Sequence, residues 1–231
     1  MKKFFEYAMM AMMMMGSAVI LNACGDDDKD APDSGEIDTR IDNVVPKDIR
    51  KNVEKYMAIY DGVNPPNVEG TYLMSKAVLV YDSENYYEAG HDFRDMYFKF
   101  ANQNSKNNTI DYDEKQGNGT QSGKGAFISG SGKNFSIYMN TTGYDGDLDV
   151  SYKLALVVSG AISSDGISGI KYAFIMVDKS GSGVDDVMEI GDYRVITDQD
   201  GLAENHSWPA GSRMADLTDG NSDFVRSIIL K

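Results

Sequence analysis

The chain has 231 residues, with 36 acidic and 22 basic side chains and a formal net charge of −14 at pH 7. An acidic domain repels phosphate backbones, so we expect no nucleic-acid partner. The single cysteine excludes a disulfide framework within the chain, and the length suits one domain with a sizeable core.

The N-terminus begins with a short basic stretch and continues as an almost entirely apolar run over residues 8–21. This run is shorter than the ~20 residues that a membrane-spanning helix needs. It closes on Leu21-Asn22-Ala23-Cys24, which resembles the lipobox of bacterial lipoproteins. The resemblance implies that residues 1–23 are a signal peptide and that lipidated Cys24 anchors the protein to a membrane. An uncleaved membrane anchor is the alternative, but it leaves the lone cysteine without an explanation.

The residues behind Cys24 are strongly acidic, with the sequence Gly25-Asp26-Asp27-Asp28-Lys29-Asp30. This run resembles the export signal of Bacteroidetes lipoproteins, and the resemblance implies display at the outer face of the outer membrane. A solvated, self-repelling spacer fits the same role, and a domain that faces the periplasm is the alternative. Because a polar, charged segment buries too little surface to fold, we interpret residues 24–45 as a flexible tether.

The next stretch carries the one helix that we expect, over residues 46–57. Pro46 suits the first position of a helix. Ile49 and Val53 lie one helical turn apart and form one apolar stripe with Tyr56 and Met57. Turn-forming residues follow at once and end the helix.

From Gly70 onward the sequence alternates between apolar segments and turns rich in Gly, Asn, Asp and Ser, which predicts strands. Short connections join antiparallel neighbours, so the simplest topology is a meander. Residues 154–158 and 170–177 are apolar at nearly every position and therefore need cover on both faces. An all-β, antiparallel, up-and-down barrel with the helix across its outside satisfies this need, and so does a two-sheet sandwich with a helix or partner on one flank. The eight expected strands lie at about 71–81, 95–103, 108–115, 122–130, 134–142, 149–163, 169–179 and 191–197.

The stretch Gly70-Thr71-Tyr72 and the late Arg194 resemble features of the calycin-type, lipocalin-like barrels. That family opens its first strand with Gly-x-Trp, and an arginine of the last strand packs on the aromatic ring. The resemblance implies a lipocalin-like barrel over residues 46–209, with Gly70, Tyr72 and Arg194 at its base and a C-terminal tail over 210–231. The stretch 60–72 also resembles uncharacterised Bacteroidetes lipoproteins, which bring a fold expectation and no assigned activity.

Residues for known chemistries are sparse. His91 and His206 lack a second histidine or a cysteine at metal-ligand spacing, so we expect no metal site and no cofactor. The carboxylates of Asp145-Gly146-Asp147-Leu148-Asp149 alternate as in calcium loops, but positions six and twelve do not fit the EF-hand pattern. We interpret that stretch as an acidic hairpin turn, with a weak calcium site as the alternative.

Tyr86, Tyr87 and His91 belong to the longest loop between the expected strands, which is a natural mouth for a barrel. We therefore take them as the candidate ligand-binding residues of a non-enzymatic surface lipoprotein that binds a small apolar or amphipathic molecule in the barrel. A glycan- or protein-binding module with a filled barrel is the alternative. An enzyme would need His91 or His206 beside carboxylates in a convergent pocket. The sequence specifies no oligomeric state.

Overall fold

The computed structural model describes residues 40–116, 119–209 and 229–231. The chain divides into a unit of residues 1–30 and a unit of residues 31–231, and every described residue belongs to the second. The expected signal peptide, Cys24 and most of the expected tether lie outside the described residues.

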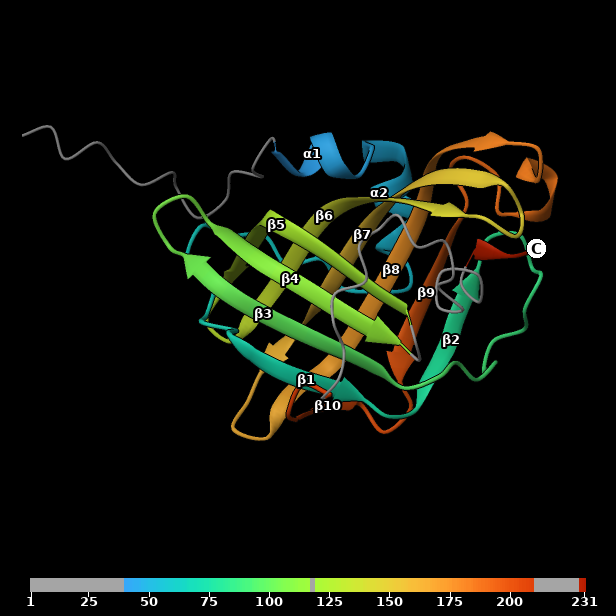
Figure 1. Cartoon of the computed structure of the whole chain (residues 1–231). Helices are drawn as coiled ribbons and strands as arrows, with labels where there is room; N and C mark the ends of the chain where they lie inside the picture. The colour runs from blue at the N-terminus through green and yellow to red at the C-terminus, as the bar shows by residue number, and fades with distance from the viewer. Residues whose placement is uncertain (1–39, 117–118, 210–228) are drawn as a thin grey trace, which may run out of the picture. The chain divides into compact units, whose positions relative to one another are not determined.

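The described part contains two short α-helices, one 3₁₀ turn and ten strands (Figure 1). Their bounds are α1 Arg40–Val44, α2 Lys47–Val53, β1 Gly70–Met74, β2 Ala77–Asp82, β3 Met96–Asn104, β4 Thr109–Gln116, β5 Gly119–Ser131, β6 Asn134–Asp145, β7 Val150–Ile162, β8 Gly166–Gly181, η1 Val184–Asp186, β9 Tyr193–Asp198 and β10 Leu202–Asn205.

All strand pairs in the sheet are antiparallel, and eight of the strands close into a ring in the order β10-β1-β3-β4-β5-β6-β7-β8. The long strand β8 makes closure possible because it has two partners on one edge. Its residues 166–168 pair with β10, and its residues 171–175 pair with β9. Strand β9 then pairs with β2, so these two strands extend the sheet beyond the ring.

The expectation of an all-β, antiparallel chain is confirmed, and strands β3 to β9 follow one another as a meander. The expected single strand at 71–81 is instead two strands, separated at Ser75 and Lys76. Strand β1 enters the ring beside β3, whereas β2 leaves it to pair with β9. Strand β10, which we did not expect, closes the ring between β1 and β8.

The inside of the ring holds the larger core, to which all eight ring strands contribute buried apolar residues. Its largest fully buried aromatic side chains are Phe98, Phe100, Tyr112, Phe135, Tyr172 and Phe174. Aromatic side chains of this size bring a large area out of water and occupy much of a small ring.

A second core lies on the outer face of β6 to β9, beneath the N-terminal helices. Ile41, Val45 and Val53 pack there with outward-facing residues of the sheet such as Val157 and Ile175. The expectation that the apolar strands are covered on both faces is therefore confirmed. The expected tether ends too late, because its residues 40–45 form α1 and the turn after it and bury Ile41 and Val45 completely.

The expected helix at 46–57 is shorter in the structure. Helix α2 covers only Lys47–Val53, with Pro46 just before it, and the chain then continues in turns. Within the described ranges, no helix has the length and apolar character needed to cross a membrane.

Candidate functional site

One end of the sheet is organised around a buried ion pair between Arg194 of β9 and Asp82 of β2. Arg194 Nε lies 2.9 Å from Asp82 Oδ2, and both side chains are fully buried. The Asp82 carboxylate also accepts the backbone N–H groups of Glu84 and Tyr87, at 3.1 Å each. Arg194 Nη2 donates to the carbonyl of Leu230 at 2.8 Å, so residues 229–231 are tied to the same place. A buried charge needs this degree of pairing to be tolerated.

The three residues that we took as ligand-binding candidates lie together at this end. The Tyr87 and His91 rings stack at 4.1 Å, and the Tyr86 ring meets the Tyr87 ring edge-on at 4.7 Å. Tyr87 in turn covers the Arg194 guanidinium at 4.8 Å. Tyr86 is 54% exposed, so the group ends at the surface. The aromatic loop therefore covers the ion pair, with its rings packed on one another.

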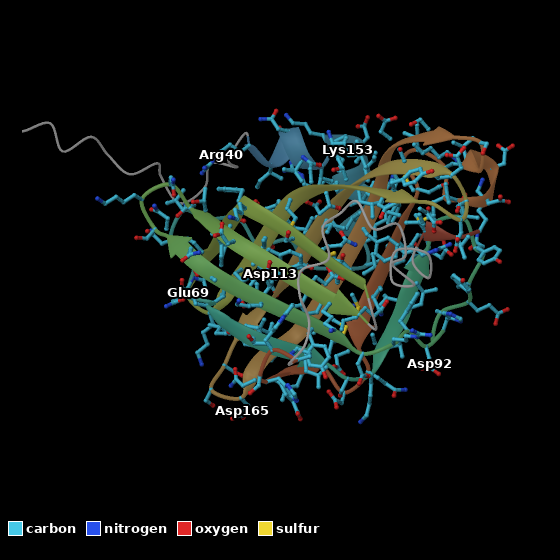
Figure 2. The ribbon with its side chains drawn as sticks, in the orientation of Figure 1. Arg40, Glu69, Asp92, Asp113, Lys153 and Asp165 are labelled. Carbon is cyan, nitrogen blue, oxygen red and sulfur yellow. The ribbon has the colours of Figure 1, made fainter. Side chains whose placement is uncertain are left out.

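The same loop protects the outer edge of the sheet. Leu79 N donates to the His91 carbonyl at 2.9 Å, and Gly90 N donates to the Leu79 carbonyl at 2.8 Å. Asp92 forms a bridge with Val78 and lies beside β2 in Figure 2. An edge strand covered in this way does not offer its hydrogen-bonding groups to other chains.

The expected barrel base differs in the structure. Arg194 packs on Tyr87, as described above, whereas the Tyr72 ring lies 5.9 Å from that of Phe100. Tyr72 Oη donates to the Val68 carbonyl at 3.0 Å, and its ring lies over Gly70, where a Cβ would come 2.8 Å from Oη. The structure thus brings Gly70 and Tyr72 together but joins Arg194 to a different aromatic residue.

A different site lies in the wall of the ring, where β5 and β6 part. These strands pair only over residues 127–131 and 134–138. Beyond Phe127 and Tyr138 each strand keeps its other partner, β4 or β7, and Figure 1 shows the two hairpins diverging. Gly125, with a φ of +66°, lies just beyond the last pair, next to a shift in register between β4 and β5. Glycine permits this positive φ at little cost, and bulges of this kind bend a strand away from its neighbour.

Polar side chains are buried on the inner face of β4, β5, β6 and β8, and we call these five residues the inner polar group: Tyr112, Glu114, Gln121, Thr141 and Tyr172. Glu114 and Gln121 are directly opposite each other on β4 and β5. Thr141 lies on β6, on the same face as Ile137 and Met139 of the inner core. The five residues of the inner polar group come from four strands, and all five side chains are buried.

The inner polar group is incompletely hydrogen-bonded. The hydroxyls of Tyr112 and Tyr172 both donate to Glu114 Oε2, the latter at 3.0 Å. Within the described part of the chain, Glu114 Oε1, both amide atoms of Gln121 and Thr141 Oγ1 are buried without a hydrogen-bond partner. Such atoms cost about 1–3 kcal/mol each when they stay unpaired, so this cluster needs an explanation.

Burial determines the protonation of Glu114. Removal from water raises the pKa of its carboxyl group, the hydrogen bonds from the two tyrosine hydroxyls offset part of this rise, and the resulting pKa is about 7 instead of 4.5. The carboxyl group therefore changes charge near neutral pH, and its free oxygen acts as donor or acceptor accordingly.

A pocket of ≈ 310 Å³ opens between β5 and β6 at the same place. Gly123, Ala126 and Met139 line it, and Arg40 and Lys124 contribute cationic side chains. Figure 2 shows Arg40 at the start of α1. Gly123 follows Gln121 by two residues and pairs with Tyr112, so strand β5 connects the pocket with the inner polar group, whose members are not among the described residues that line the pocket.

The histidines have no carboxylate contact in the described residues. His91 stacks on Tyr87 and meets Phe93 edge-on, while His206 lies against Tyr97 at 5.4 Å and the Ser207 carbonyl. Across the described ranges, no three His, Cys, Asp or Glu side chains gather as a metal site would require. The acidic stretch after β6 is a hairpin turn, in which Asp145 Oδ1 accepts the N–H groups of Asp147 and Leu148 at 3.0 Å.

The inner polar group was not among our expected site residues, although one signal in β4 points to it. Every second residue of β4 is buried inside the ring. Ile110 and Tyr112 occupy the first two of these positions, and Glu114 and Gln116 occupy the next two. Charged or amide residues at inward positions are unusual, and a strand glycine such as Gly123 often marks a bulge or a close approach.

Comparison with known proteins provides no further assignment. No protein-family model, no curated protein and no solved structure matches this chain.

Proposed function

We propose that the chain is a membrane-anchored binding protein whose eight-stranded ring, of the lipocalin-like type, takes a small amphipathic molecule. The observation that carries this proposal is the set of buried, unpaired polar atoms of Glu114, Gln121 and Thr141, on the strands next to the place where β5 and β6 part. A ligand with a hydroxyl or amide group supplies the missing partners, and the surrounding apolar side chains accept its hydrocarbon part. The role is binding rather than catalysis.

The shape of the interior limits the ligand to a small one. Six large aromatic side chains occupy the inside of the ring, and the pocket between β5 and β6 is at the lower end of the range for ligand sites. A compact hydrocarbon chain with a polar end fits this description better than a sterol or a long acyl chain.

The test compares two glutamines on the inner face, Gln121 and Gln116. Gln121→Leu removes two unpaired buried atoms, so it is expected to abolish binding of 1,8-octanediol in calorimetry and to stabilise the fold. Gln116 is equally buried, but its Nε2 already donates to the Arg94 carbonyl at 2.7 Å. Gln116→Leu is therefore expected to keep binding and to destabilise the fold by about 1 kcal/mol or more.

Native mass spectrometry of the protein as purified from cells provides an independent readout. A small molecule that is retained by the wild type and by Gln116→Leu, and lost in Gln121→Leu, supports the proposal. An unliganded mass throughout, together with no octanediol binding, contradicts it. That outcome favours the glycan-binding alternative, for which Tyr97, His206 and Trp208 on the outer face of the sheet are the residues to mutate.

The membrane anchor is proposed from the sequence alone. Cys24 lies at the end of the lipobox-like stretch, and each buried methylene of an attached acyl chain adds ~0.8 kcal/mol of membrane affinity. Cys24→Ser is expected to remove the protein from the outer-membrane fraction. Protease treatment of intact wild-type cells distinguishes display on the cell surface from a periplasmic orientation, and retention of Cys24→Ser in the outer-membrane fraction contradicts the anchor.

A further inference from the structure

The pocket between β5 and β6 has a charge pattern of its own, distinct from that of the chain as a whole. The protein carries a net charge of −14, yet the charged side chains among the described residues that line this pocket are Arg40 and Lys124. Asp111 interacts with Lys124, and its carboxylate also accepts from Asn102 Nδ2 at 2.8 Å and from Gly125 N at 3.1 Å. These hydrogen bonds lower the pKa of Asp111, and Lys124 lowers it further.

Arg40 is held in position at the pocket by the second core. Its guanidinium lies 4.1 Å above the Phe127 ring, and Nη1 donates to the Asn107 carbonyl at 2.6 Å. Ile41, the next residue, is fully buried. An arginine oriented by a ring and a backbone carbonyl presents a fixed face to a ligand at little further entropic cost.

The floor of the pocket is apolar and includes two residues of the inner core, Ala126 of β5 and Met139 of β6. Met139 packs on Gly123, because a Cβ added at Gly123 would lie 3.0 Å from Met139 Sδ. No larger side chain could therefore occupy position 123 without displacing Met139. From Gly123 the inner face of β5 continues to Gln121, opposite Glu114.

We propose that this pocket and the inner polar group form one continuous site for a linear molecule with a hydroxyl or amide at its buried end and an anionic group at its outer end. The inner end bonds Glu114 and Gln121, the hydrocarbon middle lies against Ala126 and Met139, and the anionic group meets Lys124 and Arg40. This inference rests on the proposed function, which requires only the inner end. It adds the chemistry of the outer end and the side of the ring from which the ligand binds.

Three probes of equal chain length separate the two ends: 8-hydroxyoctanoate, octanoate and 1,8-octanediol. Calorimetry at neutral pH is expected to show the tightest binding for 8-hydroxyoctanoate. The diol lacks the anionic group and should bind about tenfold more weakly, the effect of one charge-assisted hydrogen bond. Octanoate lacks the buried hydroxyl and should also bind more weakly.

Two variants of the pocket complete the test. Lys124→Gln is expected to weaken binding of 8-hydroxyoctanoate toward the level of the diol while leaving binding of the diol unchanged, and Lys153→Gln on β7 is its control. Gly123→Leu should abolish binding of all three probes, whereas Ser122→Leu, which adds the same side chain at the preceding position, should not.

The outcomes distinguish this inference from the proposed function. If the diol binds and is lost in Gln121→Leu, but Gly123→Leu and Lys124→Gln bind every probe as the wild type does, the side pocket is wrong and the inner site stands. If the wild type binds none of the three probes, both are overturned. Thermal unfolding of Gly123→Leu alongside Ser122→Leu shows whether a loss of binding reflects the pocket or a loss of fold.

Discussion

Asp82→Ala is expected to destabilise the folded domain by about 3–5 kcal/mol, the largest effect of any single exchange that we predict. The substitution leaves the fully buried guanidinium of Arg194 without its ion-pair partner at 2.9 Å. It also removes the acceptor for the N–H groups of Glu84 and Tyr87, which hold the start of the aromatic loop. Urea unfolding followed by far-ultraviolet circular dichroism measures the loss.

Two control variants show whether the loss of stability comes from an unpaired buried charge or simply from the loss of an ion pair. Lys76→Ala removes an exposed pair, in which Nζ lies 3.4 Å from Asp200 Oδ2, and should cost less than about 1 kcal/mol. The double variant Asp82→Leu/Arg194→Met should recover much of the stability lost in Asp82→Ala, because no buried charge remains. A double variant no more stable than Asp82→Ala would mean that the carboxylate acts through the loop N–H groups rather than through the ion pair.

The fold class could be derived from the sequence because it depends on local patterns. Alternation and short acidic turns are enough to predict antiparallel strands from β3 to β9. The split of residues 71–81 could not be derived, since only Ser75 and Lys76 interrupt an otherwise mostly apolar run, and β1 and β2 are distinguished by their distant partners, β3 and β9. Strand β10, four residues long, has no apolar pattern of its own and is defined by β1 and β8.

Helix α1 was missed for a related reason. Its sequence Arg-Ile-Asp-Asn-Val lies within a polar stretch and offers few apolar residues. Ile41 becomes a core residue only because the outer face of β6 to β9 is apolar and needs cover. Burial of that face, rather than intrinsic helix propensity, stabilises so short a helix.

The candidate site was less predictable than the fold. The loop with Tyr86, Tyr87 and His91 could be identified as an aromatic cluster, but its packing on Arg194 depends on the pairing of β2 with β9. The inner polar group depends on which face of β4 points into the ring and on the place where β5 and β6 stop pairing. The place where two strands stop pairing depends on the closed ring and cannot be predicted from the sequence of one strand.

The pH dependence of stability provides a test of the inner polar group that needs no ligand. Burial raises the pKa of Glu114 from 4.5 to about 7, so between these values the folded state holds a proton that the unfolded state has released. Stability therefore falls as pH rises through this window and levels off above it. At about 1.36 kcal/mol per pKa unit, the full loss is about 3 kcal/mol.

Glu114→Gln removes this titration while keeping an oxygen that accepts from Tyr112 and Tyr172. The free energies of unfolding of wild type and variant, measured in urea from pH 4 to 8.5, should therefore diverge by about 3 kcal/mol in favour of the variant as pH rises. Carboxyl groups elsewhere titrate in both proteins and cancel in the difference. Tyr172→Phe removes a hydroxyl that lowers the Glu114 pKa, so in that background the divergence should begin at the same pH, extend to higher pH and become larger. A difference that is flat from pH 4 to 8.5 would mean that the Glu114 carboxyl group is solvated, and the inner polar group would then lose its reason to bind a ligand.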